Sequence, residues 1–185
     1  MIKKFIMLAI VVFPMFGMAQ NEVMKKNTKY EDFISQSGHI TKYVDKKMEK
    51  CSYNINESFK VKLRMFYGEN ANIYYLNIEK GGSLGTSPSS AFILYSDLVE
   101  INKAFARLMS EVDEDRELKP EYLQNVYTSD DGFQVGYYVE KSKVKWIIRL
   151  EYGSYDIEFR KPEEIANYLI EAQKKIESII AQNGK

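Results

Sequence analysis

The chain of 185 residues is 45% hydrophobic and 28% charged, and its 26 basic side chains balance 26 acidic ones. A chain of this length and charge suits one domain with an ordinary core and offers no long-range attraction to nucleic acid. Cys51 is the only cysteine, so no internal disulfide can form and stability must come from packing. We expect Cys51 to be a small buried side chain or, in an oxidising compartment, half of an intermolecular disulfide.

The first nineteen residues have the pattern of a secretory signal peptide. A pair of lysines precedes an apolar run at 5–13, and a small-residue site follows at 17–19. The apolar run is shorter than the roughly 20 residues of a membrane-spanning helix, and no cysteine follows it for a lipid anchor. The sequence therefore predicts cleavage after Ala19 and an exported chain, periplasmic or extracellular, that begins at Gln20. The mature chain would carry two more acidic than basic side chains, because the leader removes two lysines and no acid.

The rest of the chain is expected to form a mobile lead-in, 20–36, which Tyr30 and Phe33 can attach to a single α+β domain, 37–185. Alternating apolar residues and turn signals predict strands, and apolar residues three and four apart predict helices. In the first half, 37–117, the predicted strands are 39–45, 60–67, 72–79 and 91–95, followed by a helix to 117. In the second half, 118–185, they are 122–128, 133–140, 144–152 and 155–160, followed by a closing helix.

Capping and turn residues predict three element boundaries. Asp97 and Glu100 match a capping box, which places the start of the first helix at Asp97. The Asp-Gly pair at 131–132 is typical of a tight hairpin turn, and Pro162 suits the first position of the closing helix. Residues 60–67 and 72–79 should pair as a hairpin. The apolar faces expected to pack are Val61, Leu63, Met65 and Tyr67 in the first hairpin strand, Leu98, Ile101, Phe105, Leu108 and Val112 in the first helix, and Ile165, Leu169, Ala172, Ile176 and Ile179 in the second.

The two halves resemble each other. The stretch that starts at Ile93 aligns without gaps with the stretch that starts at Ile157, and the stretch from Gly38 resembles the stretch from Gly132. The sequence thus predicts a tandem pair of strand-rich units, each ending in a helix. Together they would share one curved antiparallel sheet, covered on one face by the two long helices. The alternative is that any two strand–helix junctions look alike, because both meet the same capping and periodicity rules.

Few residues suit catalysis. His39 is the only histidine, and a His39–Cys51 nucleophile pair lies in no recognisable motif. The G-x-S-x-G, H-E-x-x-H and C-x-x-C signatures are missing from the sequence. A zinc site would need two carboxylates besides this histidine and cysteine. The sequence therefore predicts no catalytic residue, no zinc and no cofactor.

Acidic clusters offer only weak cation sites. Asp113, Asp115 and Glu117 alternate like the start of a calcium loop, but the glycine and the terminal glutamate of that loop are missing. Asp130 and Asp131 are explained by the hairpin turn. We therefore predict no metal site from either cluster.

Aromatic residues and one flexible loop are the candidate ligand contacts. The loop 81–90 contains Gly82 and Gly85 but lacks the Lys-Ser/Thr ending of a phosphate-binding loop, so we expect a connector that can form the rim of a binding surface. The aromatic candidates are Tyr74, Tyr75, Tyr137, Tyr138 and Trp146. Neighbouring strand residues point to opposite faces, so at most one of each adjacent tyrosine pair can face a given side.

The strand G-F-Q-V-G-Y-Y-V at 132–139, the helix entry A-F-I-L-Y-S-D-L-V-E-I at 91–101 and the closing helix make the chain resemble a family of uncharacterised exported bacterial proteins. That resemblance implies no activity and supplies no catalytic residues. The strand–helix–four-strand–helix order of the second part is also similar in topology to the TATA-binding protein fold. A role on DNA does not follow, because fold does not determine function and the mature charge is slightly negative.

The sequence favours an exported, non-catalytic binding module whose partner is a protein, a glycan or an apolar ligand. No nucleic-acid partner and no stable membrane insertion after leader cleavage are expected. The first alternative is a hydrolase of envelope or extracellular polymers that uses paired carboxylates. The second is an envelope assembly or chaperone-like factor, which would leave an apolar groove or a sheet edge open to a partner strand.

Overall fold

The computed structural model describes residues 26–38, 40–48, 51–54, 57–68, 72–82 and 88–183. In chain order these residues form α1 (Lys29–Ile34), β1 (Tyr43–Lys47), β2 (Cys51–Asn54), β3 (Glu57–Phe66), β4 (Ile73–Lys80), β5 (Ser89–Leu94), α2 (Tyr95–Glu117), β6 (Tyr122–Thr128), β7 (Gln134–Glu140), β8 (Lys143–Arg149), β9 (Ile157–Phe159) and α3 (Pro162–Asn183). The α+β class predicted from the sequence is confirmed, with all strand pairs antiparallel among the described residues.

The first sheet is built around β3, which pairs with β4 on one side and with both β1 and β2 on the other. β5 completes this sheet beyond β4. The predicted hairpin of 60–67 and 72–79 is confirmed by the β3–β4 register. Three of the four residues predicted to share its apolar face are buried: Val61, Leu63 and Met65. Tyr67 lies one residue beyond β3 and is 42% exposed.

The second sheet contains β6, β7, β8 and β9 in sequence order. At the β6–β7 turn, the Gly132 N–H donates to the Ser129 carbonyl (3.0 Å) and the Ser129 N–H donates to the Phe133 carbonyl (2.9 Å). Gly132 has a φ of +86°, a conformation that glycine adopts without strain. The predicted hairpin turn is therefore confirmed.

The two sheets repeat one order of elements, with β1 and β2 together in the place of a single first strand. Each unit has four strand positions in sequence order and then a long helix. This order fits a tandem repeat and agrees with the alignment of Ile93 with Ile157, which matches β5 with β9 and α2 with α3.

Two details of the predicted repeat are wrong. The strands form two hydrogen-bonded sheets and not one, because α2 follows β5 directly and carries the chain away before β6 begins. The alignment of Gly38 with Gly132 sets β1 against β7, whereas the strand order sets β1 against β6. Both glycines have positive φ, +82° and +86°, so the local likeness reflects a shared turn conformation and not a shared place in the repeat.

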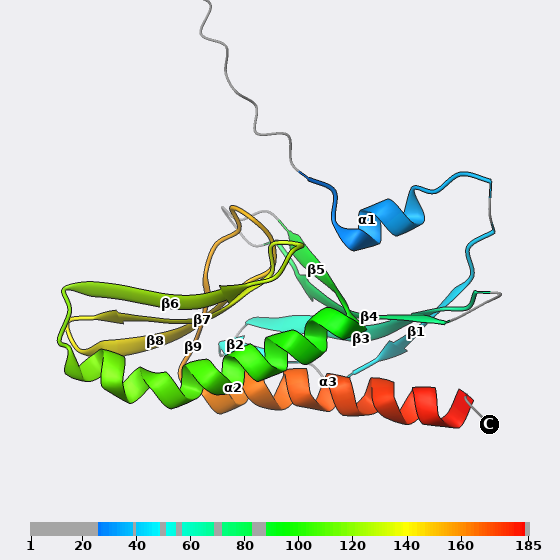
Figure 1. Ribbon diagram of the computed structural model, residues 1–185. Helices are drawn as coiled ribbons and strands as arrows, with labels where there is room; N and C mark the ends of the chain where they lie inside the picture. The colour runs from blue at the N-terminus through cyan, green and yellow to red at the C-terminus, as the bar shows by residue number, and fades with distance from the viewer. Residues whose placement is uncertain are drawn as a thin grey trace, which may run out of the picture.

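The two long helices pack against each other on the same side of the two sheets, with α2 extending under the second sheet and α3 under the first (Figure 1). α2 contacts β4 and β5 of the first sheet and β6, β7 and β8 of the second. The predicted apolar stripes are buried at Leu98, Ile101, Phe105, Leu108, Ile165, Leu169, Ala172 and Ile176, with Val112 and Ile179 partly buried beside them. The two units therefore share one core. Within the described part of the chain, no helix combines the length and apolar character needed to cross a membrane.

The first helix begins two residues before the predicted start. Its N-cap is Leu94, which makes no side-chain capping bond, so the predicted cap by Asp97 is wrong. The physical reason is a competing partner, because the Asp97 carboxylate accepts from the Lys29 ammonium at 2.8 Å instead. Asp97 still lies in the first turn, where the helix dipole favours an acidic side chain.

A short helix, α1, was not predicted within the lead-in. It is closed by a capping box, in which Thr28 Oγ1 accepts from the Glu31 N–H and the Thr28 N–H donates to the Glu31 carboxylate. Tyr30 stacks on Phe92 of β5, with ring centroids 3.6 Å apart, and Phe33 meets the ring of Phe66 edge-on at 4.8 Å. Tyr30 and Phe33 thus attach this segment to the first sheet, as the sequence predicted.

Candidate functional site

A cavity of about 730 Å³ lies where the two units meet, between α1, β5, the β6–β7 turn and the segment that follows β8. Its lining residues are Lys26, Thr28, Tyr30, Glu31, Ile34, Ser90, Ala91, Phe92, Ile93, Asp97, Ser129, Asp130, Asp131, Phe133, Leu150, Glu151 and Tyr152. The tandem arrangement creates this space, because β5 ends the first sheet and the β6–β7 turn belongs to the second.

Part of the cavity wall is apolar. Ala91, Ile93, Phe133 and Leu150 are buried members of the shared core that also line the cavity. Tyr152 also lines the cavity, and its ring covers the β6–β7 turn, where a Cβ atom on Gly132 would lie 2.4 Å from it. The glycine at 132 therefore serves both the positive φ of the turn and the close approach of this ring.

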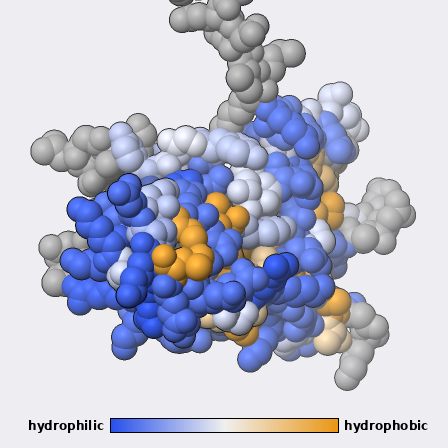
Figure 2. Space-filling model, turned by 60° about the vertical axis from the view of Figure 1, so that its left-hand side comes forward, coloured by the Kyte–Doolittle hydropathy of each residue, from blue (hydrophilic) through white to orange (hydrophobic). Residues whose placement is uncertain are grey.

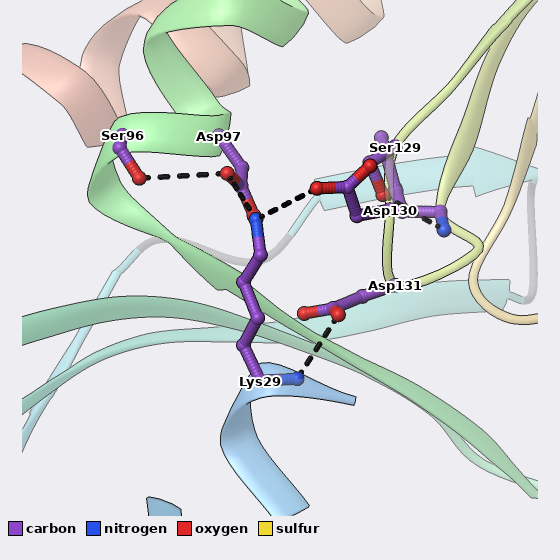
Figure 3. Close-up of polar contacts among 7 residues, drawn as sticks. Lys29, Ser96, Asp97, Ser129, Asp130 and Asp131 are labelled. Atoms are coloured by element: carbon purple, nitrogen blue, oxygen red, sulfur yellow. Dashed lines mark hydrogen bonds and ion pairs between the residues drawn. The ribbon is translucent and has the colours of Figure 1, made fainter. Parts of the chain in front are cut away.

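Another part of the wall is acidic, with carboxylates from α1, α2, the β6–β7 turn and the segment after β8. Lys29 of α1 reaches across it, and its Nζ lies 2.8 Å from Asp97 of α2 and 3.3 Å from Asp130 of the β6–β7 turn. The Lys29 backbone N–H also donates to Asp131 Oδ1 at 3.0 Å. Figure 3 shows the ammonium between the first two carboxylates, with Asp131 beside the start of α1. These contacts hold α1 against both units at once.

The protonation behaviour of this wall follows from burial and charge. Burial lowers the pKa of Lys29, but hydrogen bonds and attraction to Asp97 and Asp130 outweigh it, so the pKa is raised above 10.5. Burial raises the pKa of Asp131 above its ordinary 3.8. Its Oδ2 atom is buried and has no hydrogen-bond partner among the residues that the structure describes. Burial, followed by the charges of Asp131 and Asp97, raises the pKa of Tyr75 to about 12.

Arg64 of β3 holds Tyr30 in place from the other side. Its Nη1 donates to the Tyr30 hydroxyl at 2.5 Å, while Nε and Nη2 bind the two oxygens of Asp45 at 2.7 and 2.8 Å. The guanidinium also lies over the ring of Tyr43, 4.1 Å from its centroid. Only 11% of the Arg64 side chain is exposed. This buried cluster therefore fixes the position of Tyr30 and with it the position of α1.

Replacing Asp45 with asparagine should reduce stability more at neutral pH than in acid. Hydrogen bonds from Arg64 hold the pKa of Asp45 below 3.8. The stabilisation is therefore present above pH 3.8 and is lost as the pH falls through the lower folded value. We expect Asp45→Asn to cost about 1.5 kcal/mol near pH 7 and clearly less near pH 2, measured by urea unfolding. The control is Asp113→Asn, at a carboxylate that is 76% exposed. An equal cost at both pH values for Asp45→Asn would contradict the assignment.

None of the five aromatic candidates from the sequence lines the cavity. Tyr74, Tyr137 and Trp146 point into the shared core and are 8% exposed or less. Tyr75 is buried on the other face of β4, where it meets Tyr30 edge-on. The predicted alternation of neighbouring tyrosines is therefore correct, but an exposed binding ring is not available at these four positions.

Tyr138 is the one predicted aromatic residue that is half-buried on the outer face of the second sheet. Its hydroxyl donates to Glu158 at 2.6 Å, and its ring stacks with that of Tyr122, whose exposed fraction is 59%. The side of the molecule that carries β6–β8 is mostly hydrophilic, with a compact hydrophobic patch (Figure 2). Gly82 is exposed just after β4 and does not line the cavity.

Gly85, a predicted ligand contact, and the rejected His39–Cys51 pair cannot be placed at a site. Gly85 and His39 lie outside the described residues, and Cys51 is described only as part of the β2 backbone, paired with Phe59. The acidic cluster at 113–117 that resembles the start of a calcium loop binds other groups of the protein. Asp113 pairs with Arg116, and Asp115 accepts a hydrogen bond from the Tyr137 hydroxyl at 2.6 Å. Among the residues described, no three His, Cys, Asp or Glu side chains converge as a metal site requires.

The residues that build the cavity were missed because their partners are far apart in sequence. Lys29 and Asp97 are separated by 68 positions, and Lys29 and Asp131 by 102. The capping box at Thr28 is the one local signal that marked α1. No family model, curated protein or solved structure matches this chain, so the site stands on its own geometry.

Proposed function

We propose that the mature chain is an exported, non-catalytic binding module and that its ligand site is the cavity under α1. The observation that carries the proposal is the cavity itself. Its volume of about 730 Å³ falls within the range of sites that take small molecules or short peptide segments. An apolar wall with a few polar groups at one side is also the usual composition of such sites.

Export is the second part of the proposal and rests on the leader pattern in residues 1–19. In an exported protein, the ligand would come from the periplasm or the medium. The chain that begins at Gln20 is therefore the form to use in binding experiments.

Hydrolysis is the second candidate function, because carboxylates do converge at the cavity. Asp97 and Asp130 bind the same ammonium nitrogen, and Asp131 has a raised pKa that suits a proton donor. Against this candidate, the Lys29 ammonium lies between the Asp97 and Asp130 carboxylates and occupies both of them. Binding without turnover therefore accounts better for the geometry.

Filling the cavity should abolish binding. Ser90 is an exposed residue of β5 that lines the cavity, and Ser89 beside it does not line it. We expect equilibrium dialysis of residues 20–185 against small-molecule envelope extracts to retain compounds that mass spectrometry identifies. Ser90→Trp should lose at least about 90% of the retained amount through steric exclusion, and Ser89→Trp should keep it.

Two results would overturn the proposal: no retained compound, or equal retention by Ser90→Trp and the original chain. Conversion of the retained compounds into cleaved products during dialysis would support the hydrolase instead. Recovery of the compounds with unchanged mass supports the binding module.

A further inference from the structure

We infer that the ligand of this cavity is an organic cation, an ammonium or guanidinium group joined to an apolar or aromatic body. This inference rests on the proposed site and adds the chemical class of its ligand. Two sources share this chemistry: a peptide segment with a lysine or arginine beside an apolar residue, and a free amphiphilic amine.

The chain itself already presents this chemistry to the cavity wall. At the start of α1, the Lys29 ammonium lies between Asp97 and Asp130, and the next ring, that of Tyr30, stacks on Phe92 at 3.6 Å. The wall thus binds a cation and an aromatic ring side by side. A ligand with the same two groups would meet complementary surfaces in the space that remains.

The charge of the lining also favours a cation. Among the residues that the structure describes, the acidic residues that line the cavity are Glu31, Asp97, Asp130, Asp131 and Glu151, and Lys26 is the basic one. Lys29 offsets part of this charge from the edge of the cavity. The enclosed space therefore keeps an excess of negative charge, which attracts a cation and disfavours an anion.

An unsatisfied acceptor in the wall points to a missing donor. Asp131 lines the cavity, and its Oδ2 is buried without a hydrogen-bond partner among the described residues, while Oδ1 accepts from the Lys29 N–H. A buried carboxylate oxygen without a partner is costly, so a donor supplied by a ligand restores a favourable state. An ammonium or guanidinium N–H is the strongest donor for this purpose.

The cavity has room for the ligand beside Lys29. The volume of about 730 Å³ is the space left with α1 in place. The ligand cation binds Asp130 and, once the Asp131 carboxylate turns its buried Oδ2 towards the cavity, Asp131 as well. Its apolar body lies on the wall formed by Phe92, Ile93 and Phe133.

The test is a calorimetric titration of residues 20–185 at low salt and neutral pH. The peptide arm uses N-acetyl-lysyl-tyrosine amide, with N-acetyl-norleucyl-tyrosine amide as its neutral match. The amine arm uses phenethylammonium, with phenethyl alcohol as its neutral match. We expect the cation in at least one arm to bind about tenfold more tightly than its neutral match, and the arm with the tighter cation identifies the source.

Two variants test the residues. Asp131→Asn keeps the shape and removes the charge, and should weaken cation binding about tenfold. Lys29→Met removes the competing ammonium but keeps the backbone bond to Asp131 and the Tyr30–Phe92 stacking that also hold α1, and should strengthen cation binding by a similar factor. Asp113→Asn, at a carboxylate outside the cavity, should change nothing, and unchanged thermal melting of Asp131→Asn shows that its fold is intact.

Equal binding of the cation and its neutral match, no binding by either cation, or full affinity in Asp131→Asn would overturn the ligand class. These results would not decide whether the cavity is the ligand site. The Ser90→Trp comparison tests that separately, because it uses envelope compounds of any charge. If Ser90→Trp retains those compounds as well as the original chain does, the site fails, whatever the titrations show.

Discussion

Truncation of Phe105 to alanine is expected to lower the free energy of unfolding by about 3–5 kcal/mol. Phe105 is 2% exposed in α2, and its ring meets Trp146 of the second sheet edge-on at 5.5 Å. The substitution would leave a void at the point where a helix of the first unit packs on strands of the second. A loss of this size is a large part of the stability of an ordinary domain.

The measurement is denaturant unfolding followed by far-UV circular dichroism and by fluorescence of Trp146, the only tryptophan. Because both units share one core, the two signals should change together in a single transition. Arg107→Ala is the matched control, since its side chain is 79% exposed on the same helix and pairs only with Glu111 among the ion pairs described. It should cost less than about 0.5 kcal/mol. Two separate transitions, or a Phe105→Ala cost as small as that of the control, would contradict the shared core.

Substitution of Gly136 by alanine should be similarly damaging. A Cβ atom at this position of β7 would lie 2.2 Å from the Asn125 carbonyl oxygen and 2.7 Å from the Val126 Cα, both in the backbone of β6. Backbone cannot move aside as the end of a flexible side chain can, so the β6–β7 pairing must open. We expect a loss of about 3 kcal/mol or more.

Thermal melting of Gly136→Ala and Gly81→Ala measures this effect with its control. A Cβ atom on Gly81 would meet no described atom within 4 Å, and the residue has no positive φ. Its substitution should therefore change stability by less than about 0.5 kcal/mol. Similar melting temperatures for the two variants would show that β6 does not approach β7 as closely as described.

Local patterns in the sequence were sufficient for the long helices and most strands. The apolar residues of α2 recur every three or four positions. In the Asp-Gly pair at 131–132, the glycine adopts the positive φ that the hairpin turn requires. Such signals depend on neighbours along the chain. The predicted start of α2 was wrong because the partner of Asp97 is Lys29, which no local pattern reveals.

The candidate site could not be predicted in the same way. Two adjacent tyrosines in a strand must face opposite sides of the sheet. The sequence does not show, however, that other residues cover both sides. For Tyr75, that cover is Tyr30 of α1, a helix too short to show periodicity. The cavity depends on how two units meet, so its acidic wall draws on residues that the sequence assigned to a cap and a turn.

The tandem architecture explains why the cavity lies where it does. Each unit alone is a small sheet with one long helix, and α2 joins them by packing on strands of both. The remaining space between β5 and the β6–β7 turn is closed by α1, which binds both sides through Lys29. The proposed ligand site is thus a consequence of the tandem arrangement and not of either unit by itself.

The most direct test of the proposed site is amide chemical-shift mapping of residues 20–185, with the compounds retained in dialysis as titrant. We expect the largest shifts to cluster at Ser90, Phe92 and Asp131, around the cavity. Shifts that cluster instead around Tyr138 on the outer face of the second sheet, or that are spread evenly over the chain, would contradict the proposed site.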